Sequence, residues 1–313
     1  MRKALSTPNS SITPVREGAG KASALAILLA AGLLLGITTN LSKISAGAGF
    51  SPLAYLVWSL IGATAILLAH AFSRGVLPVL NLRSMEYFVI AGFLTTAGAN
   101  LIFFSAVPHL GVSFIALLLA LPPLLTYAGA LVLGMERFCR WRASGVLLAL
   151  SGTGLLVARQ WSAADAQLMW IGVALLGPLM LAGGNLYRSW RWPPGASPES
   201  LAPGMLVAAT AMLLIYAFSA GAGLALPTSV NAFATVLVVV QAAIFAGQFL
   251  LMFKLQKAGG PVFLSLMGGV SAVFGVPIAM VLLAEPALPG MLPSAVLVAS
   301  GIACLLRGAK RTG

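Results

Sequence analysis

Asn40-Leu41-Ser42-Lys43 opens a stretch that continues to Gly49-Phe50-Ser51-Pro52, and the chain carries this pattern twice. The second copy is Asn185-Leu186-Tyr187-Arg188 followed by Gly195-Ala196-Ser197-Pro198, 145–146 residues later. Four more positions recur at a constant offset of 149: Gly98, Phe104, Gly111 and Glu136 return as Gly247, Phe253, Gly260 and Glu285. A repeat with a nearly fixed register predicts two copies of one structural unit.

The composition predicts that both copies lie in a membrane. The chain has 313 residues, of which 60% are hydrophobic and 8% charged, with a mean hydropathy of +1.02. Long charge-free stretches are separated by Gly and Pro breakers, and about 20 apolar residues suffice to cross roughly 30 Å of hydrocarbon. We expect ten transmembrane helices, at 22–44, 53–73, 87–107, 110–133, 142–158, 167–188, 201–221, 231–253, 260–283 and 289–306.

The distribution of charge orients these helices. With ten spans, 16 of the 18 lysines and arginines fall on the side that holds both termini. The positive-inside rule places that side in the cytoplasm. It also explains the net charge of +12 without nucleic acid as a partner. Five helices per unit is an odd number, so the predicted fold is an all-α polytopic membrane protein with two inverted five-helix repeats.

The expected organisation is a disordered cytoplasmic tail (1–21), a first repeat (22–160), a second repeat (161–306) and a cytoplasmic C-terminal tail (307–313). Inverted repeats are typical of secondary transporters, in which two similar halves open a central site alternately to either side. A duplication that only built a stable bundle is the alternative.

Several motifs resemble the repeat unit of the EamA family in the drug/metabolite transporter superfamily. Leu133-Gly134-Met135-Glu136-Arg137, followed by Gly145 and Gly152-Thr153-Gly154, is similar to the end of its fourth helix and its fifth helix. Gly36, Asn40 and Lys43 followed by Ser51-Pro52 are similar to its first helix and connection. The resemblance covers about 22–306 in two copies. It implies a carrier of the bacterial inner membrane, often an exporter of amino acids or other small metabolites, with a cavity between the halves.

Polar residues inside the spans are the candidate pathway, because such residues face a cavity or a neighbouring helix. Thr96, Asn100 and Phe103 share one helix face, and Gln241 and Gln248 share another. Amides donate and accept hydrogen bonds, which suits a zwitterionic or polar neutral solute. Hydrogen bonding between helices is an equally open interpretation. The full set of pathway candidates is Asn40, Lys43, Thr96, Asn100, Phe103, Pro122, Pro123, Thr126, Gln241, Gln248 and Ser271.

Two spans are expected to be interrupted. Pro122-Pro123 removes two backbone donors near the middle of the fourth span, with Thr126 just beyond. Gly268-Gly269, Ser271 and Pro277 lie in the corresponding part of the ninth span. We predict that both interrupted helices line the pathway, with simple kinks and close packing as the alternative.

The charged residues at the helix ends are expected to have structural or gating roles. Glu136 and Glu285 are predicted to tie helix ends to neighbouring loops. Lys43 and Arg188 lie at opposite mouths, where gating or solute attraction is one interpretation. For Arg188 an inner-face topology charge is the favoured one. No cation or carboxylate is expected at mid-membrane depth.

The sequence has no HExxH, zinc-ligand spacing, Walker loop or Asp-rich motif, so no catalytic residue, metal or cofactor is expected. The favoured function is a secondary transporter, and the alternatives are a non-transporting assembly subunit and a membrane-embedded lipid-modifying enzyme. The expected partners are a small-molecule substrate and the lipid bilayer, without nucleic acid. Whether the chain forms a homodimer stays open, as do its substrate, direction and coupling.

Overall fold

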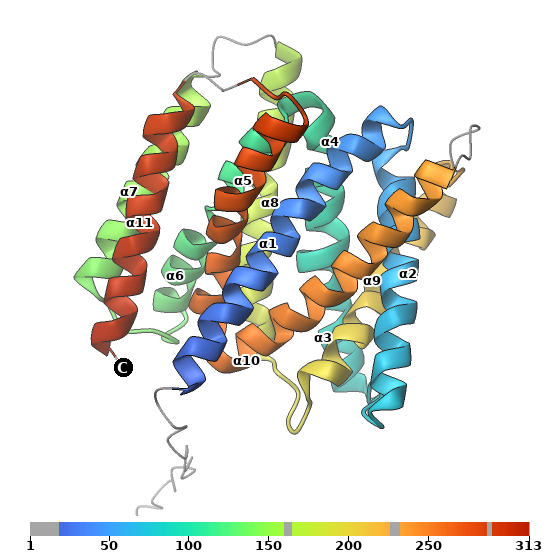
Figure 1. Cartoon of the computed structure of the whole chain (residues 1–313). Helices are drawn as coiled ribbons and strands as arrows, with labels where there is room; N and C mark the ends of the chain where they lie inside the picture. The colour runs from blue at the N-terminus through green and yellow to red at the C-terminus, as the bar shows by residue number, and fades with distance from the viewer. Residues whose placement is uncertain (1–18, 160–164, 226–231, 287–289, 313) are drawn as a thin grey trace, which may run out of the picture.

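A computed structural model describes residues 19–159, 165–225, 232–286 and 290–312. Nearly all of the predicted N-terminal tail lies outside these ranges, as does the predicted boundary between the repeats at 160/161. The described ranges are helical, with no strand among them (Figure 1). The elements in chain order are α1 (Ala19–Gly47), α2 (Pro52–Ser73), α3 (Leu82–Gly92), η1 (Phe93–Ala97), α4 (Gly98–Leu110), α5 (Val112–Leu118), α6 (Pro122–Val132), α7 (Arg140–Arg159), α8 (Asp165–Trp190), α9 (Pro198–Ser219), α10 (Ala232–Leu282) and α11 (Met291–Thr312).

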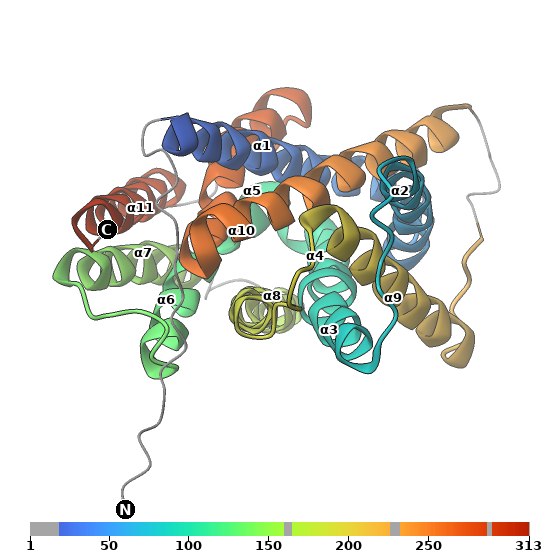
Figure 2. The same ribbon diagram turned by 90° about the horizontal axis from the view of Figure 1, so that it is seen from below.

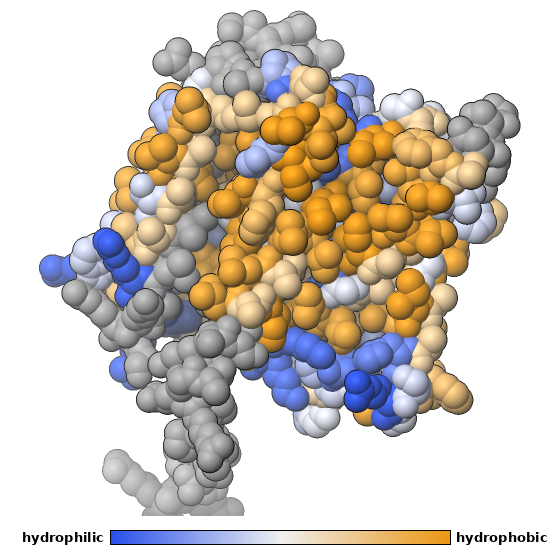
Figure 3. Space-filling model, viewed as in Figure 1, coloured by the Kyte–Doolittle hydropathy of each residue, from blue (hydrophilic) through white to orange (hydrophobic). Residues whose placement is uncertain are grey.

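Within these ranges, eight helical segments are long and apolar enough to cross a membrane. They comprise α1, α2, the continuous run Leu82–Leu110, the run Val112–Val132, α8, α9, and the two parts of α10 on either side of its kink. The space-filling view shows the apolar side chains as a broad field and the hydrophilic ones gathered at its lower edge (Figure 3). The chain is therefore a multi-pass membrane protein. α7 and α11 fall outside this set of eight, although Met291–Gly301 in α11 is a shorter apolar helix.

The predicted interruption of the fourth span is present. The span divides into α5 and α6, and Pro122 and Pro123 occupy the first turn of α6, where a missing N–H costs least. Pro122 and Pro123 are buried in the bundle.

The predicted interruption of the ninth span is wrong. α10 stays helical through Gly268-Gly269 and Pro277, and its one non-helical residue is Gly260, the first residue of the predicted ninth span. Gly268 serves packing instead, because a Cβ there would overlap the carbonyl oxygen of Leu119, in the break between α5 and α6. Only glycine permits so close an approach of two backbones.

The repeated sequence folds into repeated local structure. Ser51 and Ser197 are both extended N-caps, and their hydroxyls accept hydrogen bonds from the N–H groups of Ala54 (3.1 Å) and Ser200 (3.2 Å). Gly111 (φ 83°) and Gly260 (φ 70°) adopt the left-handed backbone that glycine tolerates, each just before a helix. The positions that repeat in the sequence therefore correspond to equivalent helix caps and turns in the structure.

Two helix pairs bring equivalent elements of the copies together. α2 packs against α9, and α7 packs against α11 at the opposite edge of the bundle (Figure 2). Thr64 and Thr210 are 146 residues apart and their hydroxyl oxygens lie at 3.4 Å. Leu119 and Gly268, which meet at the helix break, are 149 residues apart. In both contacts a residue of one copy touches its own counterpart in the other copy.

Candidate functional site

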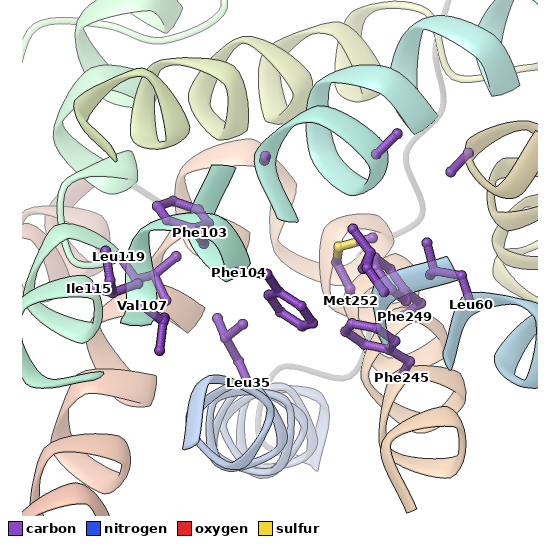
Figure 4. Close-up of a cluster of buried hydrophobic side chains, with 14 of the residues drawn as sticks. Leu35, Leu60, Phe103, Phe104, Val107, Ile115, Leu119, Phe245, Phe249 and Met252 are labelled. Carbon is purple, nitrogen blue, oxygen red and sulfur yellow. The ribbon is translucent and has the colours of Figure 1, made fainter. Parts of the chain in front are cut away.

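A small cavity of about 50 Å³ lies in the bundle between α1, α4, α8 and α10. Six of its lining residues are polar, namely Thr38, Thr39, Ser42, Thr95, Asn100 and Gln248. The apolar lining residues are Leu35, Phe103, Phe104, Val107, Leu119, Leu181, Phe249, Met252 and Met267, and Figure 4 shows how several of them converge from α1, α4 and α10. The space holds only a few water molecules, so a larger solute needs the surrounding helices to move apart.

Buried hydrogen bonds fix the orientation of the polar wall between α1 and α10. The hydroxyl of Thr38 donates to Gln248 Oε1 and accepts from Gln241 Nε2, both at 3.1 Å. The hydroxyl of Tyr55, on α2, donates to Gln241 Oε1 at 3.4 Å. Three helices are therefore linked by one network whose end, Gln248, reaches the cavity. Gln241, a predicted pathway residue, lies behind the wall and supports it.

The predicted face of the third span only partly reaches the cavity. Asn100 and Phe103 line it, whereas Thr96 is fully buried outside the lining. Asn100 Nδ2 donates to the carbonyl of Thr96 at 2.9 Å, which leaves its amide oxygen without a partner on its own helix. Phe103 packs against Gly177 of α8, where a larger residue would collide with the ring.

Other predicted residues hold the bundle together away from the cavity. Asn40 Nδ2 donates to the carbonyls of Gly36 (2.8 Å) and Gly275 (3.1 Å), and so ties α1 to α10 where two glycines let the helices approach. Ser271 donates to the carbonyl of Gly268 at 2.7 Å. Thr126 is fully buried and its hydroxyl has no hydrogen-bond partner. None of these three side chains lines the cavity.

Glu285 connects the two copies at one end of the bundle. Its carboxylate accepts from the N–H of Val112 at 2.8 Å and from the N–H and hydroxyl of Ser113 at 2.9 and 2.8 Å. These groups form the first turn of α5, so the carboxylate satisfies donors that a helix leaves free at its N-terminus. Half-exposed Lys43 lies 3.9 Å from the same carboxylate. Glu285 thus joins the ends of α1, α5 and α10.

Glu136 is engaged differently at the other end. Its carboxylate accepts from Arg142 Nη1 at 2.6 Å, six residues further along the chain. Both partners belong to the first copy, whereas Glu285 contacts the opposite copy. The two equivalent glutamates therefore do not hold equivalent contacts in this conformation.

Arg188, predicted as an inner-face charge, lies two residues before the end of α8, and its side chain is fully buried. Nη2 donates to Asn185 Oδ1 at 2.8 Å, and Nη1 lies 3.4 Å from Thr95 Oγ1 and 3.2 Å from Met252 Sδ. Thr95 and Met252 both line the cavity. Gly184 packs against Thr95 and lets α8 approach so closely that the arginine points into the bundle rather than toward solvent.

Sequence reasoning missed four polar residues of the wall, namely Thr38, Thr39, Ser42 and Thr95. Hydroxyls in helices commonly bond to their own backbone, as Thr39 does to Leu35 (3.0 Å) and Thr95 to Ala91 (2.6 Å), so they are weak signals. The cluster Thr38-Thr39-Asn40 with Ser42 inside one apolar span was the available clue.

Together, the fold and the site define a multi-pass helical membrane protein with a small cavity among its helices, lined by both polar and apolar side chains. Residues 22–158 match the EamA-like transporter family. This match covers the first copy of the repeat, and the EamA-like family belongs to the drug/metabolite transporter superfamily.

Two further comparisons extend this result. No curated protein gives a significant match to the chain. A solved structure described only as "Crystal structure of protein" is similar over 93% of this chain and 99% of its own, with 16% identity and a TM-score of 0.64. At that identity the likeness concerns the fold alone, and it extends across both copies.

Proposed function

We propose that this protein is a secondary transporter that exports small metabolites such as amino acids across the bacterial inner membrane by alternating access. The observation that carries the proposal is the small cavity in the bundle with its six polar lining residues, because both copies of the repeat build it. α1 and α4 of the first copy contribute Thr38 and Asn100, and α8 and α10 of the second contribute Leu181 and Gln248. A site shared by two repeats is the arrangement that alternating access requires.

The topology we propose has ten spans, with α7 and α11 added to the eight apolar segments. Three observations support it. α7 and α11 pack along each other as α2 and α9 do. The start of α1 and the end of α11 lie at the same end of the bundle, as an even number of crossings demands (Figure 1). The contacts Thr64–Thr210 and Leu119–Gly268 join equivalent positions, as expected for inverted copies related by a two-fold axis. Both termini are then cytoplasmic by the positive-inside rule.

The unequal contacts of the two glutamates suggest how the copies exchange roles. Glu285 caps α5, just after Gly111, and thereby closes one end. Its equivalent, Glu136, has an equivalent target in the turn after Gly260, where Val262 clusters with Met135. In the opposite state we expect Glu136 to leave Arg142 and cap this turn, while Glu285 releases Ser113. Each state then closes one end with one glutamate.

Counterflow in proteoliposomes tests the transport proposal. Vesicles loaded with millimolar amino acids or other small metabolites are diluted into medium containing a trace of the same labelled solute, and saturable accumulation is measured. Gly268→Leu is the matched inactive control, because its side chain would collide with Leu119 in the break between α5 and α6, beside the cavity. If no solute accumulates above empty vesicles, the chain is a non-transporting subunit. Turnover of a lipid without accumulation would indicate an enzyme.

A further inference from the structure

We propose that Arg188 is the anion-binding group of the cavity and that it recognises a carboxylate of the solute. This assignment rests on the proposed function, since it names the chemistry of what the site holds. Arginine is the side chain best suited to a carboxylate, because its planar fork donates two parallel hydrogen bonds.

The positive charge of Arg188 is buried in the bundle. A guanidinium removed from water is stable only if it is paired or well hydrogen-bonded. Arg188 is fully buried, and its partners are one amide oxygen, one hydroxyl at 3.4 Å and the sulfur of Met252. Its Nε–H has no partner, and the ring of Phe253 lies 5.5 Å from its carbon Cζ. These groups solvate the cation only in part.

The acidic side chains that the structure describes do not pair with Arg188. Four of the six acidic residues are glutamates whose ion pairs the structure describes: Glu86 with Arg191, Glu136 with Arg142, Glu199 with Lys254 and Glu285 with Lys43. Asp165 begins α8, roughly 35 Å along the helix from Arg188 at about 1.5 Å per residue. Glu17 lies outside the described ranges. Within those ranges the protein supplies Arg188 with no counter-ion.

The equivalent cation in the first copy of the repeat does have an acidic partner. Lys43 is the counterpart of Arg188, and it faces Glu285 at 3.9 Å. The corresponding acid for Arg188 is Glu136, which Arg142 holds instead. The first copy therefore pairs its cation at this position, whereas the second leaves its cation buried and without an acid.

Arg188 is not itself a lining residue of the cavity, but it lies directly behind the cavity wall. Nη1 contacts Thr95 Oγ1 and Met252 Sδ, and both residues form part of the cavity wall. A thioether is a weak acceptor on a flexible chain, so a carboxylate oxygen displaces it readily. The amide oxygen of Asn100 and the NH₂ group of Gln248, which the hydrogen bonds described above do not use, remain for the rest of the solute. One cation selects a monocarboxylate, since a second negative charge would stay unpaired.

The test measures binding to the whole purified protein in detergent, independently of transport. The probes are the twenty amino acids, their carboxamides, lactate, pyruvate and inorganic phosphate, each at millimolar concentration, with the thermal unfolding midpoint as the readout. We expect at least one carboxylate to raise the midpoint of the wild type while its amide does not. Stabilisation by neutral amides or amines equal to that by the acids would overturn the assignment, as would stabilisation by phosphate alone.

Substitutions of Arg188 test whether this side chain is responsible for the binding of the carboxylate. Arg188→Gln should weaken the binding of the stabilising carboxylate by about 30-fold or more, as expected when one partner of a buried charge pair is removed. Arg188→Lys should give an intermediate loss, because it keeps the charge but not the fork. The matched control, Arg191→Gln, changes an arginine three residues away that is paired with Glu86 and should leave binding unchanged. Equal binding by Arg188→Gln and the wild type would refute the proposal.

If Arg188→Gln does not fold, the unfolding midpoints of the wild type with the acids and with their amides still test whether the protein recognises a carboxylate. The two proposals also fail separately. Carboxylate binding that depends on Arg188 without any counterflow would refute transport and leave the site in place. Counterflow restricted to solutes without a carboxylate would refute the role of Arg188 and leave transport in place.

Discussion

Replacing Glu285 with glutamine should open the end of the bundle where α5 begins. In the wild type Oε1 accepts from Val112, and Oε2 accepts twice from Ser113. The glutamine amide keeps one acceptor oxygen, and its NH₂ group must face an N–H donor. One hydrogen bond to a charged acceptor is lost, which costs about 1.5–3 kcal/mol, and the remaining two lose their charge assistance. We expect a total near 3 kcal/mol, or roughly a hundred-fold rise in the open population at this end.

Cysteine accessibility measures that population. Val112→Cys places a thiol at a fully buried position in the first turn of α5, in a chain whose Cys139 and Cys304 are replaced by serine. The rate of modification by a charged thiol reagent should rise roughly a hundred-fold when Glu285→Gln is added, because the reagent reaches the thiol only in the open state. Glu136→Gln is the matched control at the opposite end and should not raise the rate at this thiol.

A modification rate that changes less than twofold in Glu285→Gln would refute the reasoning, since the carboxylate would then contribute nothing to closure. A loss of folded protein, checked by the unfolding midpoint, would raise the rate in every cysteine variant alike. The comparison with a second buried thiol far from this end therefore separates local opening from global unfolding.

Three further predictions concern the packing, the buried hydrogen-bond network and the repeat. Gly268→Ala should abolish stable folding or transport, because the new Cβ overlaps a backbone carbonyl. Gly183→Ala meets open space and should be neutral or slightly stabilising. Size-exclusion profiles recorded after heating compare the two variants. Thr38→Val should cost about 1–3 kcal/mol in the free energy of unfolding, because it leaves two buried glutamine amides without their shared partner, and an unchanged unfolding midpoint would contradict the network. Ser51→Ala and Ser197→Ala should each cost about 1 kcal/mol, and a large inequality between them would show that the two caps are not equivalent.

The sequence predicted the repeat and its turns because caps and left-handed glycines depend on local chemistry. A serine before a proline caps a helix wherever it occurs, so Ser51 and Ser197 could be recognised as equivalent from residues alone. The double proline likewise predicted the break between α5 and α6. Gly268-Gly269 did not produce a second break, since glycine in a helix can serve close packing as well as interruption.

The cavity was less accessible to prediction because it depends on contacts between distant segments. Asn100 and Gln248 were found because an amide in an apolar span is conspicuous. Thr38 was missed because a threonine in a helix usually bonds to its own backbone. For Arg188 the sequence indicated a position near a helix end but not the burial of its side chain. Its burial follows from the approach of α8 to η1, which no local pattern records.

The contact between Leu119 and Gly268 has a consequence for biosynthesis. The two residues are separated by 149 positions, so the broken segment α5–α6 emerges from the ribosome long before α10 exists. At about 5–20 residues per second, the interval is roughly 7 to 30 s. During that time α1 and α4 can already pack against α5, and the N–H groups of Leu119, Ala120 and Leu121 find acceptors within the segment itself. The break can therefore form in the membrane before the glycine that later packs against it has been synthesised.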